Sequence, residues 1–455
     1  MDKLARFVLD YVTYVVKGSP KFYAWMGFLG VLIVIWVYGN YVQATEGLAI
    51  TGLTSQVSDG LYLGNFVFLV GVAAAAVTVV FPAYVYHHKA LHDVTVLGEM
   101  VAISAVIMCI LFILSHMGRP DRLWHMMPII GIFNFPHSML AFDTLVLMVY
   151  LLLNAVCGFY FLYTKYTGSR VNRSWYMPLI YVSIVWALSI HTVTALFVNT
   201  MPARPFWHHG MMPIQFISTA FAAGPALIIL IFLIIRRNTK LAIADEAINL
   251  LSTIATYCLG IALFLLMSEV VTEFYHPTEH SLGLEYLMFG VHGLSPLVPW
   301  FWASLAANIV AFVMLMIPGV RKNYRLLPVA CVLAFAGIWV QKGVGLLVPG
   351  YIPSPIGEFT NYVPTAIELL ITLGNWAIGF VILTILAKGA IGILLGEVKY
   401  ASEPWAVSRD VAPPGFEPTR MQPWAPLTDR GARVEMGGGA RPGRRARRQG
   451  RVALG

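Results

Sequence analysis

The stretch VAISAVIMCILFILSH, residues 101–116, lies within an apolar run of about 20 residues, the length that crosses a bilayer as a helix. Apolar runs of similar length recur along the chain, which is typical of a polytopic membrane protein. We therefore predict an all-α protein with about ten transmembrane helices. The predicted spans are 23–45, 60–86, 97–117, 136–163, 176–199, 213–235, 248–274, 286–317, 327–347 and 364–394. Similar polar residues recur about 155 residues apart, which suggests two four-helix bundles, spans two to five and six to nine, with spans one and ten flanking them.

Composition supports this class. Of the 455 residues, 58% are hydrophobic and 11% are charged, whereas about 25% are charged in a soluble domain. The spans divide the chain into a cytoplasmic N-terminal segment at 1–22, a membrane domain at 23–395 and a tail at 396–455. The tail is rich in Pro, Gly and Arg. We expect it to be disordered and cytoplasmic, and we expect no nucleic-acid binding.

Lysine and arginine gather on one side of the predicted topology. The N-terminal segment and the even-numbered loops hold fourteen of them, and the odd-numbered loops hold three. Cytoplasmic loops carry the excess of positive charge, so we expect both termini in the cytoplasm and the protein in the inner (cytoplasmic) membrane. The fourteen are Lys3, Arg6, Lys17, Lys21, Lys89, Lys165, Arg170, Arg173, Arg236, Arg237, Lys240, Arg321, Lys322 and Arg325; the three are Arg119, Arg122 and Arg204.

Ionisable residues in the spans share one depth. A charge at the bilayer centre costs at least about 2.5–3.5 kcal/mol, so each such residue needs a function or a partner. Eight of them map to the outer halves of the spans, which predicts a proton-handling site just below the outer surface. They are His116, Asp143, His191, Glu269, Glu273, His292, Lys342 and Glu368.

The densest polar segment starts at His116, and Asp143 follows about two turns into the next span. Histidine exchanges protons near neutral pH. A histidine and a carboxylate facing one pocket could accept the two protons released when a quinol is oxidised. The alternative is an interfacial loop whose polar groups only bind one another.

The fifth span and its outer loop hold a second candidate group. His191 is followed by Thr194 on the same helix face, and Trp207 and His208 follow in the loop. An indole and an imidazole there suit an aromatic belt at the membrane interface, and they could equally stack on a ring-shaped ligand.

Two carboxylates in the seventh span, Glu269 and Glu273, are spaced i, i+4 and share a face. This spacing suits a proton relay toward the outer surface. Lys342 and Glu368 could take part in the relay, or could pair and only hold two helices together.

The second span opens between Asp59 and Asn65. The amide of Asn65 could bond a quinone carbonyl or simply another helix. The four cysteines, Cys109, Cys157, Cys258 and Cys331, lie singly inside spans, so we expect no iron–sulfur cluster and no metal site on this chain.

Three motifs carry a family resemblance. They are Asn-Phe-Val-Phe-Leu-Val-Gly at 65–71, His-Met-Gly-Arg-Pro at 116–120, and His191-Thr192 with Arg-Pro-Phe-Trp-His at 204–208. Together they resemble the NrfD family, also called the polysulfide reductase membrane subunit (PsrC-like) family, over about residues 20–395. The ten spans look most like the P subunits of DsrMKJOP sulfite-reduction-associated complexes. The C subunits of the Hmc complex and of alternative complex III are near alternatives.

The resemblance implies a quinone-interacting subunit of a respiratory complex that is not catalytic alone. Such subunits bind menaquinone or ubiquinone near the outer face and usually carry no haem. They exchange electrons with an extracytoplasmic iron–sulfur (ferredoxin-like) subunit, beside other membrane and cytochrome subunits. The family's histidine and aspartate map onto His116 and Asp143, and its polar first bundle helix maps onto Asp59 and Asn65. The resemblance also implies anaerobic respiration in dissimilatory sulfur metabolism.

The resulting expectations are specific. The loops at 118–135 and 200–212 should dock the partner through Trp124, Phe133, Phe206 and Trp207. The predicted catalytic residues are His116, Asp143 and His191; the predicted quinone-binding residues are Asp59, Asn65, His116, Arg119, Asp143, His191, Trp207 and His208; the predicted proton relay is Glu269 and Glu273.

Two other classes of function remain open. An ion- or proton-coupled transporter would also bury acids and histidines, but near the bilayer midplane beside broken helices. A haem b cytochrome would need histidines in the inner halves of the spans. His87, His88 and His92 reach only the inner surface, which disfavours the cytochrome.

Overall fold

The computed structural model describes residues 3–92, 94–127 and 129–400. Within these residues the chain is helical, and its only β-type pairing is an isolated bridge between Val291 and Leu294. Ten segments of this part of the chain are long and apolar enough to cross a membrane. The prediction of an all-α polytopic membrane protein is therefore confirmed.

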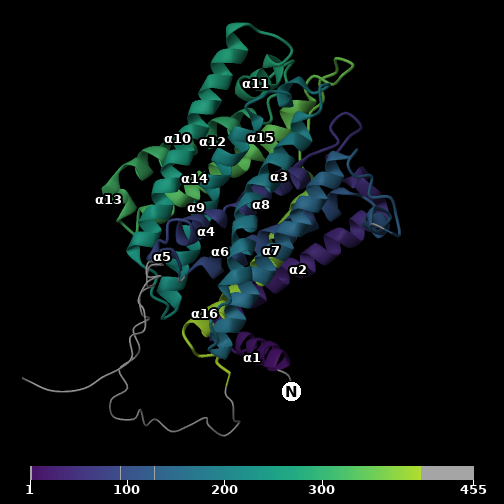
Figure 1. The fold of residues 1–455 in the computed structure, drawn as a ribbon. Helices are drawn as coiled ribbons and strands as arrows, with labels where there is room; N and C mark the ends of the chain where they lie inside the picture. Colours follow the sequence, from purple (N-terminus) through teal and green to yellow (C-terminus); the bar gives the residue numbers. More distant parts are fainter. Residues whose placement is uncertain (1–2, 93, 128, 401–455) are drawn as a thin grey trace, which may run out of the picture. The chain divides into compact units, whose positions relative to one another are not determined.

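The helices follow the predicted order (Figure 1). The α-helices are α1 Lys3–Val16, α2 Pro20–Glu46, α3 Leu61–Ala74, α4 Val77–Tyr84, α5 Lys89–His92, α6 Thr95–His116, α7 Met139–Thr167, α8 Arg173–Asn199, α9 Met212–Asn238, α10 Asp245–Tyr275, α11 Ser281–Met288, α12 Val298–Met316, α13 Pro318–Arg321, α14 Leu327–Lys342, α15 Val344–Leu347 and α16 Ala366–Leu394. The 3-10 helices are η1 Gly47–Ile50, η2 Pro120–Met126, η3 Pro205–Trp207 and η4 Val348–Tyr351.

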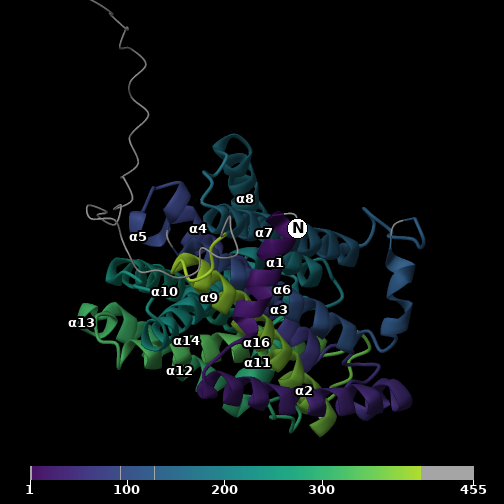
Figure 2. The same ribbon diagram turned by 90° about the horizontal axis from the view of Figure 1, so that it is seen from below.

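The long helices form the two predicted four-helix groups. In the first bundle, α3 and α4 pack with α6, α7 and α8; in the second, α9, α10, α12 and α14 pack together. The bundles meet where α9 contacts α3 and α8. Helices α2 and α16 pair with each other, and α16 also packs on α6. Figure 2 shows α2 at the periphery beside α16, in keeping with its mostly exposed, lipid-type surface.

The two ends of this helical domain differ in sequence. We call the end where α6 finishes the His116 end, and the end where α7 finishes the Lys165 end. In Figure 1 the His116 end is uppermost, near α11, and the Lys165 end is lowermost, near α1. The positively charged loops counted above all belong to the Lys165 end.

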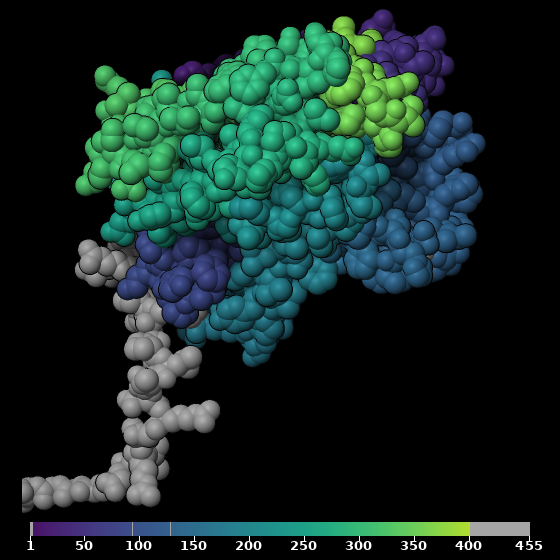
Figure 3. Space-filling view, turned by 90° about the horizontal axis from the view of Figure 1, so that it is seen from above, coloured from purple at the N-terminus to yellow at the C-terminus, as the bar shows by residue number. Residues whose placement is uncertain are grey.

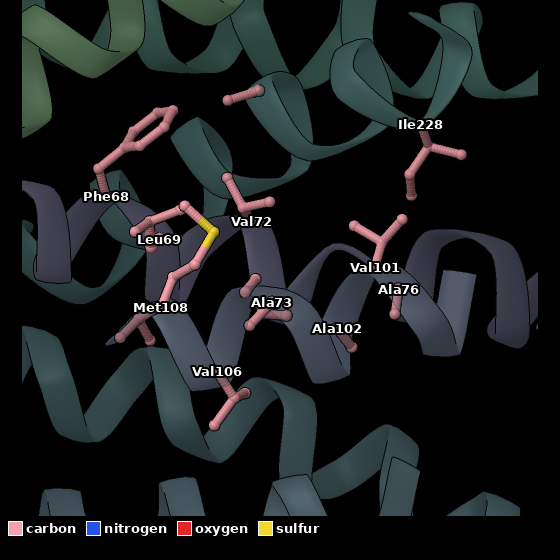
Figure 4. Close-up of a cluster of buried hydrophobic side chains, with 14 of the residues drawn as sticks. Phe68, Leu69, Val72, Ala73, Ala76, Val101, Ala102, Val106, Met108 and Ile228 are labelled. Atoms are coloured by element: carbon pink, nitrogen blue, oxygen red, sulfur yellow. The ribbon is translucent and has the colours of Figure 1, made fainter. Parts of the chain in front are cut away.

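Helix α3 forms the centre of the first bundle and is buried on every side. Small and β-branched residues allow it to approach its neighbours closely. In Figure 4, Val72, Ala73 and Ala76 face Val101 and Ala102 of α6, with Ile228 of α9 nearby. Small residues at such contacts are characteristic of helix packing in membranes. A helix that is hydrophobic all round suits this buried position.

Three predicted spans are interrupted. The predicted continuous span at 286–317 is wrong, because α11 ends at Met288 and α12 begins only at Val298. Gly290 and Gly293 between them adopt positive φ angles of 84° and 79°, which a helix cannot contain. His292 therefore lies exposed in a loop rather than inside a span. The second span breaks between α3 and α4, and the ninth breaks at Gly343, which separates α14 from α15.

Candidate functional site

A polar cluster lies at the His116 end, where α6 finishes. Nε2 of His116 lies 2.9 Å from Oδ1 of Asp59, in the loop before α3. The Tyr351 hydroxyl donates a hydrogen bond to the other carboxylate oxygen, and it also lies 3.0 Å from the Ser58 hydroxyl. The side chains of His116 and Asp59 remain 23% and 17% exposed. The pair is therefore partly shielded and still reachable.

Two residues of the loop before α9 complete this cluster. The Arg204 guanidinium lies 4.3 Å from the centroid of the Tyr351 ring. The Trp207 ring meets the same tyrosine edge-on at 5.0 Å, and its indole N–H donates to the carbonyl of Leu346 at 2.9 Å. Burial lowers the pKa of Arg204, and the Asp59 carboxylate opposes this shift. We call Asp59, His116, Arg204, Trp207 and Tyr351 the Asp59 cluster.

Two buried nitrogen atoms of the Asp59 cluster have no hydrogen-bond partner among the residues that the structure describes. They are Nδ1 of His116 and Nη1 of Arg204. Most buried polar atoms in proteins are paired, so each exception asks for an explanation. A ligand that carries hydroxyl or carbonyl oxygens would satisfy both atoms.

A second cluster lies deeper, inside the helices. The Thr194 hydroxyl of α8 donates to Oδ1 of Asp143 on α7 at 2.7 Å. One turn earlier on α8, Nε2 of His191 lies 2.9 Å from Nζ of Lys342 on α14 and 2.7 Å from the carbonyl oxygen of Phe216 on α9. All of these side chains are at least nine-tenths buried. We call Asp143, His191, Thr194 and Lys342, with the Phe216 carbonyl, the His191 cluster.

Two cavities lie beside α14. The smaller, of about 70 Å³, is lined by Lys342, Glu269, Gln215, Thr219 and Gln341 among others. The Gln215 side chain donates to Oε2 of Glu269 at 2.7 Å.

The larger cavity, of about 200 Å³, has mostly apolar walls. The first turns of α3, the ends of α14 and α15, and α12 surround it. Its lining includes Leu61, Asn65, Trp300, Trp339 and Val344.

Asn65, Arg119 and His208 already have partners. The Asn65 oxygen accepts hydrogen bonds from the indoles of Trp339 and Trp376, at 2.9 Å each. Arg119 forms an exposed bidentate pair with Asp121, and this hydrogen bond lowers the pKa of Asp121. His208 is exposed, and its Nδ1 lies 2.7 Å from the Asn199 carbonyl. A quinone-binding role for these three residues stays a prediction.

His116 and Asp143, predicted to face one pocket, have different hydrogen-bond partners, and so have Lys342 and Glu368, for which a relay or a pair was expected. His116 binds Asp59, whereas Asp143 binds Thr194, so the two do not form one hydrogen-bonded pair. Nor does Lys342 pair with Glu368. The carboxylate of Glu368 accepts from the backbone N–H groups of Gly52 and Thr365 and from the Tyr362 hydroxyl. It fixes the loops before α3 and α16, where Thr365 and Glu368 form a capping box.

Sequence reasoning missed two residues. Nothing in the sequence singles out Tyr351, because it is 292 positions away from Asp59 along the chain and only the fold brings the two together. Glu99 gave a signal that was overlooked, since it is an acid within the apolar run of α6. It is 2% exposed, and its Oε2 has no partner.

The described part of the chain has ten membrane-type helices, eight in two bundles and two flanking them, with a partly exposed His116–Asp59 pair at one end. These features define a polytopic membrane protein built around a polar site. Residues 49–353 match the family model described as "Polysulphide reductase, NrfD". The chain belongs to this family, whose membrane subunits are generally quinone-interacting.

Two relatives belong to reductases. The C subunit of the selenate reductase of Mesobacillus selenatarsenatis is 23% identical over 365 residues, which cover 71% of this chain and 81% of the relative. The putative membrane C subunit of a dimethyl sulfoxide reductase of Halobacterium salinarum is 25% identical over 396 residues, which cover 79% of this chain and 88% of the relative. The chain is accordingly similar to membrane subunits of multi-subunit reductase complexes.

Proposed function

We propose that this chain is the quinone-interacting membrane subunit of a respiratory redox complex, and that it oxidises quinol at the Asp59 cluster. The observation that carries this proposal is the His116–Asp59 pair, with the second ring nitrogen of His116 buried and unpartnered. A base held by a carboxylate on one side and open on the other suits proton abstraction from a hydroxyl group.

Quinol oxidation releases two electrons and two protons. In the proposed arrangement, Nε2–H of His116 donates to Asp59, which leaves Nδ1 as the acceptor for a hydroxyl proton. Tyr351 helps to hold Asp59 in place. The free Nη1 of Arg204 can donate to an oxygen of the ring. The apolar cavity beside Leu61, two residues after Asp59, suits the isoprenoid chain.

The electrons must leave through another subunit, and we propose that it is an extracytoplasmic iron–sulfur protein docked at the His116 end. The segment between α6 and α7 exposes an unusual set of apolar side chains, which marks an interaction surface. They are Trp124, Met127, Ile129, Ile130, Ile132 and Phe135. In Figure 3 the blue surface that includes this segment forms one edge of the His116 end.

The second predicted docking loop needs a correction. Trp207 is only 1% exposed and Phe206 lines the smaller cavity, so these two rings do not form a docking surface. Trp207 instead packs inside the Asp59 cluster.

Orientation and metabolic role belong to the same proposal. The charge bias of the loops supports an orientation with the Lys165 end and both termini in the cytoplasm. The reductase names of the relatives favour quinol oxidation over quinone reduction. Three further points stay predictions: menaquinone or ubiquinone as the substrate, additional cytochrome subunits, and a role as a P subunit in sulfur metabolism.

An ion-coupled transporter is the second candidate. The break after α14 beside the buried Lys342 resembles the broken helices of transporters. Ion uptake by the purified subunit in vesicles, without any electron donor, would favour this candidate.

The test uses the assembled complex with a water-soluble quinol and an artificial electron acceptor. His116→Ala should slow electron transfer by about 10²-fold or more, because the base is lost. His125→Ala, an exposed histidine of η2 at the same end, is the matched control and should turn over normally. Wild-type turnover of an assembled His116→Ala complex would refute the proposed site.

A further inference from the structure

The buried amine of Lys342 is the most unusual group in the described helices. Its residue is 5% exposed, and none of its hydrogen-bond partners in the described residues is a carboxylate. Nζ contacts Nε2 of His191 at 2.9 Å and the Phe216 carbonyl at 3.1 Å, and it lies 4.3 Å from the Phe216 ring centroid. A cation held in a membrane domain without an anion is expensive and points to a function.

With a charged amine, one fixed set of protons cannot satisfy all three polar atoms. Nε2 of His191 lies within hydrogen-bonding distance of both the amine and the Phe216 carbonyl oxygen. If Nε2 carries a proton, an ammonium group faces an N–H, and if Nε2 is bare, its lone pair faces the carbonyl oxygen. A neutral amine can instead accept from Nε2–H and donate to the carbonyl at 3.1 Å. The arrangement is therefore compatible with uptake and release of a proton by the amine.

The pair joins the two bundles. His191 belongs to α8 of the first bundle and Lys342 to α14 of the second, and both press against Gly71 of α3. A Cβ atom at Gly71 would lie 3.2 Å from Cε1 of His191 and 3.3 Å from Nζ of Lys342. A Cβ atom there would force His191 or Lys342 to shift by a few tenths of an ångström. On the first-bundle side, Thr194 lies one turn further along α8 and donates a hydrogen bond to Asp143 of α7.

On the second-bundle side, Lys342 faces the smaller cavity together with Glu269. The cavity measures about 70 Å³, and Gln215, Gln341 and Thr219 add polar groups to its wall. A space of this kind is large and polar enough to hold water, which needs two to four polar partners. Water there would connect the amine with the carboxylate.

We propose that a proton passes between His191 and Lys342 across the bundle interface and then through water in this cavity to Glu269. This relay rests on the proposed function, because quinol oxidation supplies the proton while its electrons leave for the partner's acceptor. Each transfer moves one proton from a donor nitrogen or oxygen to the next acceptor and changes no oxidation state. The relay thus gives the second bundle a role in releasing protons derived from quinol.

The experiment measures quinol turnover and proton release in vesicles that contain the assembled complex. Lys342→Met and Glu269→Gln should each slow coupled turnover by about tenfold or more. Both should slow proton release in step with turnover, with an unchanged KM for quinol. Glu269→Asp keeps an exchangeable carboxyl and should restore most of the proton release.

Lys388→Met is the control for lysine removal, since its amine donates to the backbone carbonyls of Val15 and Lys17 at the opposite end. It should leave the rates of turnover and proton release unchanged. If the Lys342→Met complex fails to assemble, the comparison of Glu269→Gln with Glu269→Asp tests the relay. Wild-type proton release in Glu269→Gln, or a raised KM alone, would overturn the relay. Wild-type turnover in His116→Ala would instead overturn the proposed function.

Discussion

The Asp59 cluster and the His191 cluster differ in how the chain builds them. The Asp59 cluster gathers loop and helix-end residues from four distant parts of the chain, and it is partly open to solvent. The His191 cluster is built from residues within α7 and α8 and from the last residue of α14, and it is closed. A partly exposed cluster suits a ligand, whereas a closed one suits protons alone. Substitutions in the two clusters should therefore change different measured quantities.

Asp59→Asn should produce the largest effect. The amide cannot hold His116 as a carboxylate does, so the histidine loses the group that orients it and stabilises its charged form. Electron transfer from quinol should fall by about 10²-fold, measured as the rate of acceptor reduction. Asp121→Asn, whose carboxylate is exposed and paired with Arg119, is the control. Equal rates for the two variants would contradict an orienting role for Asp59.

Gly71→Ala addresses the closed cluster. The added methyl group meets both His191 and Lys342 at 3.2–3.3 Å, so it should separate the amine from the imidazole. Overpacking of this kind costs about 1–3 kcal/mol. Proton release should therefore slow by about tenfold while quinol affinity stays unchanged. Gly27→Ala on α2, where a Cβ meets nothing within 4 Å, is the matched control. A weaker quinol affinity in Gly71→Ala would place the ligand at this cluster instead.

Ile132→Asp tests the docking surface. Its side chain is 84% exposed in the segment between α6 and α7. A charge there should weaken partner binding by about 1–2 kcal/mol, or roughly tenfold in Kd. Pull-down of the iron–sulfur subunit measures the change. Ser55→Asp, an exposed loop position at the same end, should retain the partner. Full retention by Ile132→Asp would move the interface elsewhere.

Trp207→Phe should have the smallest effect. It removes the indole hydrogen bond to Leu346 but keeps an aromatic ring against Tyr351. Loss of one such bond costs about 1 kcal/mol. We expect a slightly lower Tm of the complex and turnover reduced no more than a few-fold. The control is Trp175→Phe at the start of α8, because that indole is exposed at the opposite end of the helical domain. A larger loss of turnover than in Asp59→Asn would indicate that Trp207 contacts the ligand directly.

The fold was largely predictable because hydropathy reports length and burial. Ten membrane-type segments lie within a few residues of the predicted spans, apart from three breaks. Hydropathy did not show these breaks. The residues at them are small and apolar or neutral, so the local mean hydropathy stays high; they are Ala75, Gly290 and Gly343. Only backbone geometry separates a glycine inside a helix from one that ends it.

The depth of the site residues in the membrane was predictable from the sequence, but which side chains pair with one another was not. A residue's position along a helix follows from the sequence, and this placed His116, His191 and Lys342 near the same end. Which side chains meet depends on lateral packing between helices, which periodicity does not encode. His116 therefore meets Asp59 rather than Asp143, and Lys342 meets His191 rather than Glu368.

Quinol binding at the open cluster can be tested by photolabelling the assembled complex with an azidoquinone. After irradiation, mass spectrometry maps the modified peptides. We predict labels near Asp59, His116, Arg204 and Tyr351, and their loss when unlabelled quinone competes. Labels confined to the walls of the cavity between Lys342 and Glu269 would contradict quinol binding at the Asp59 cluster.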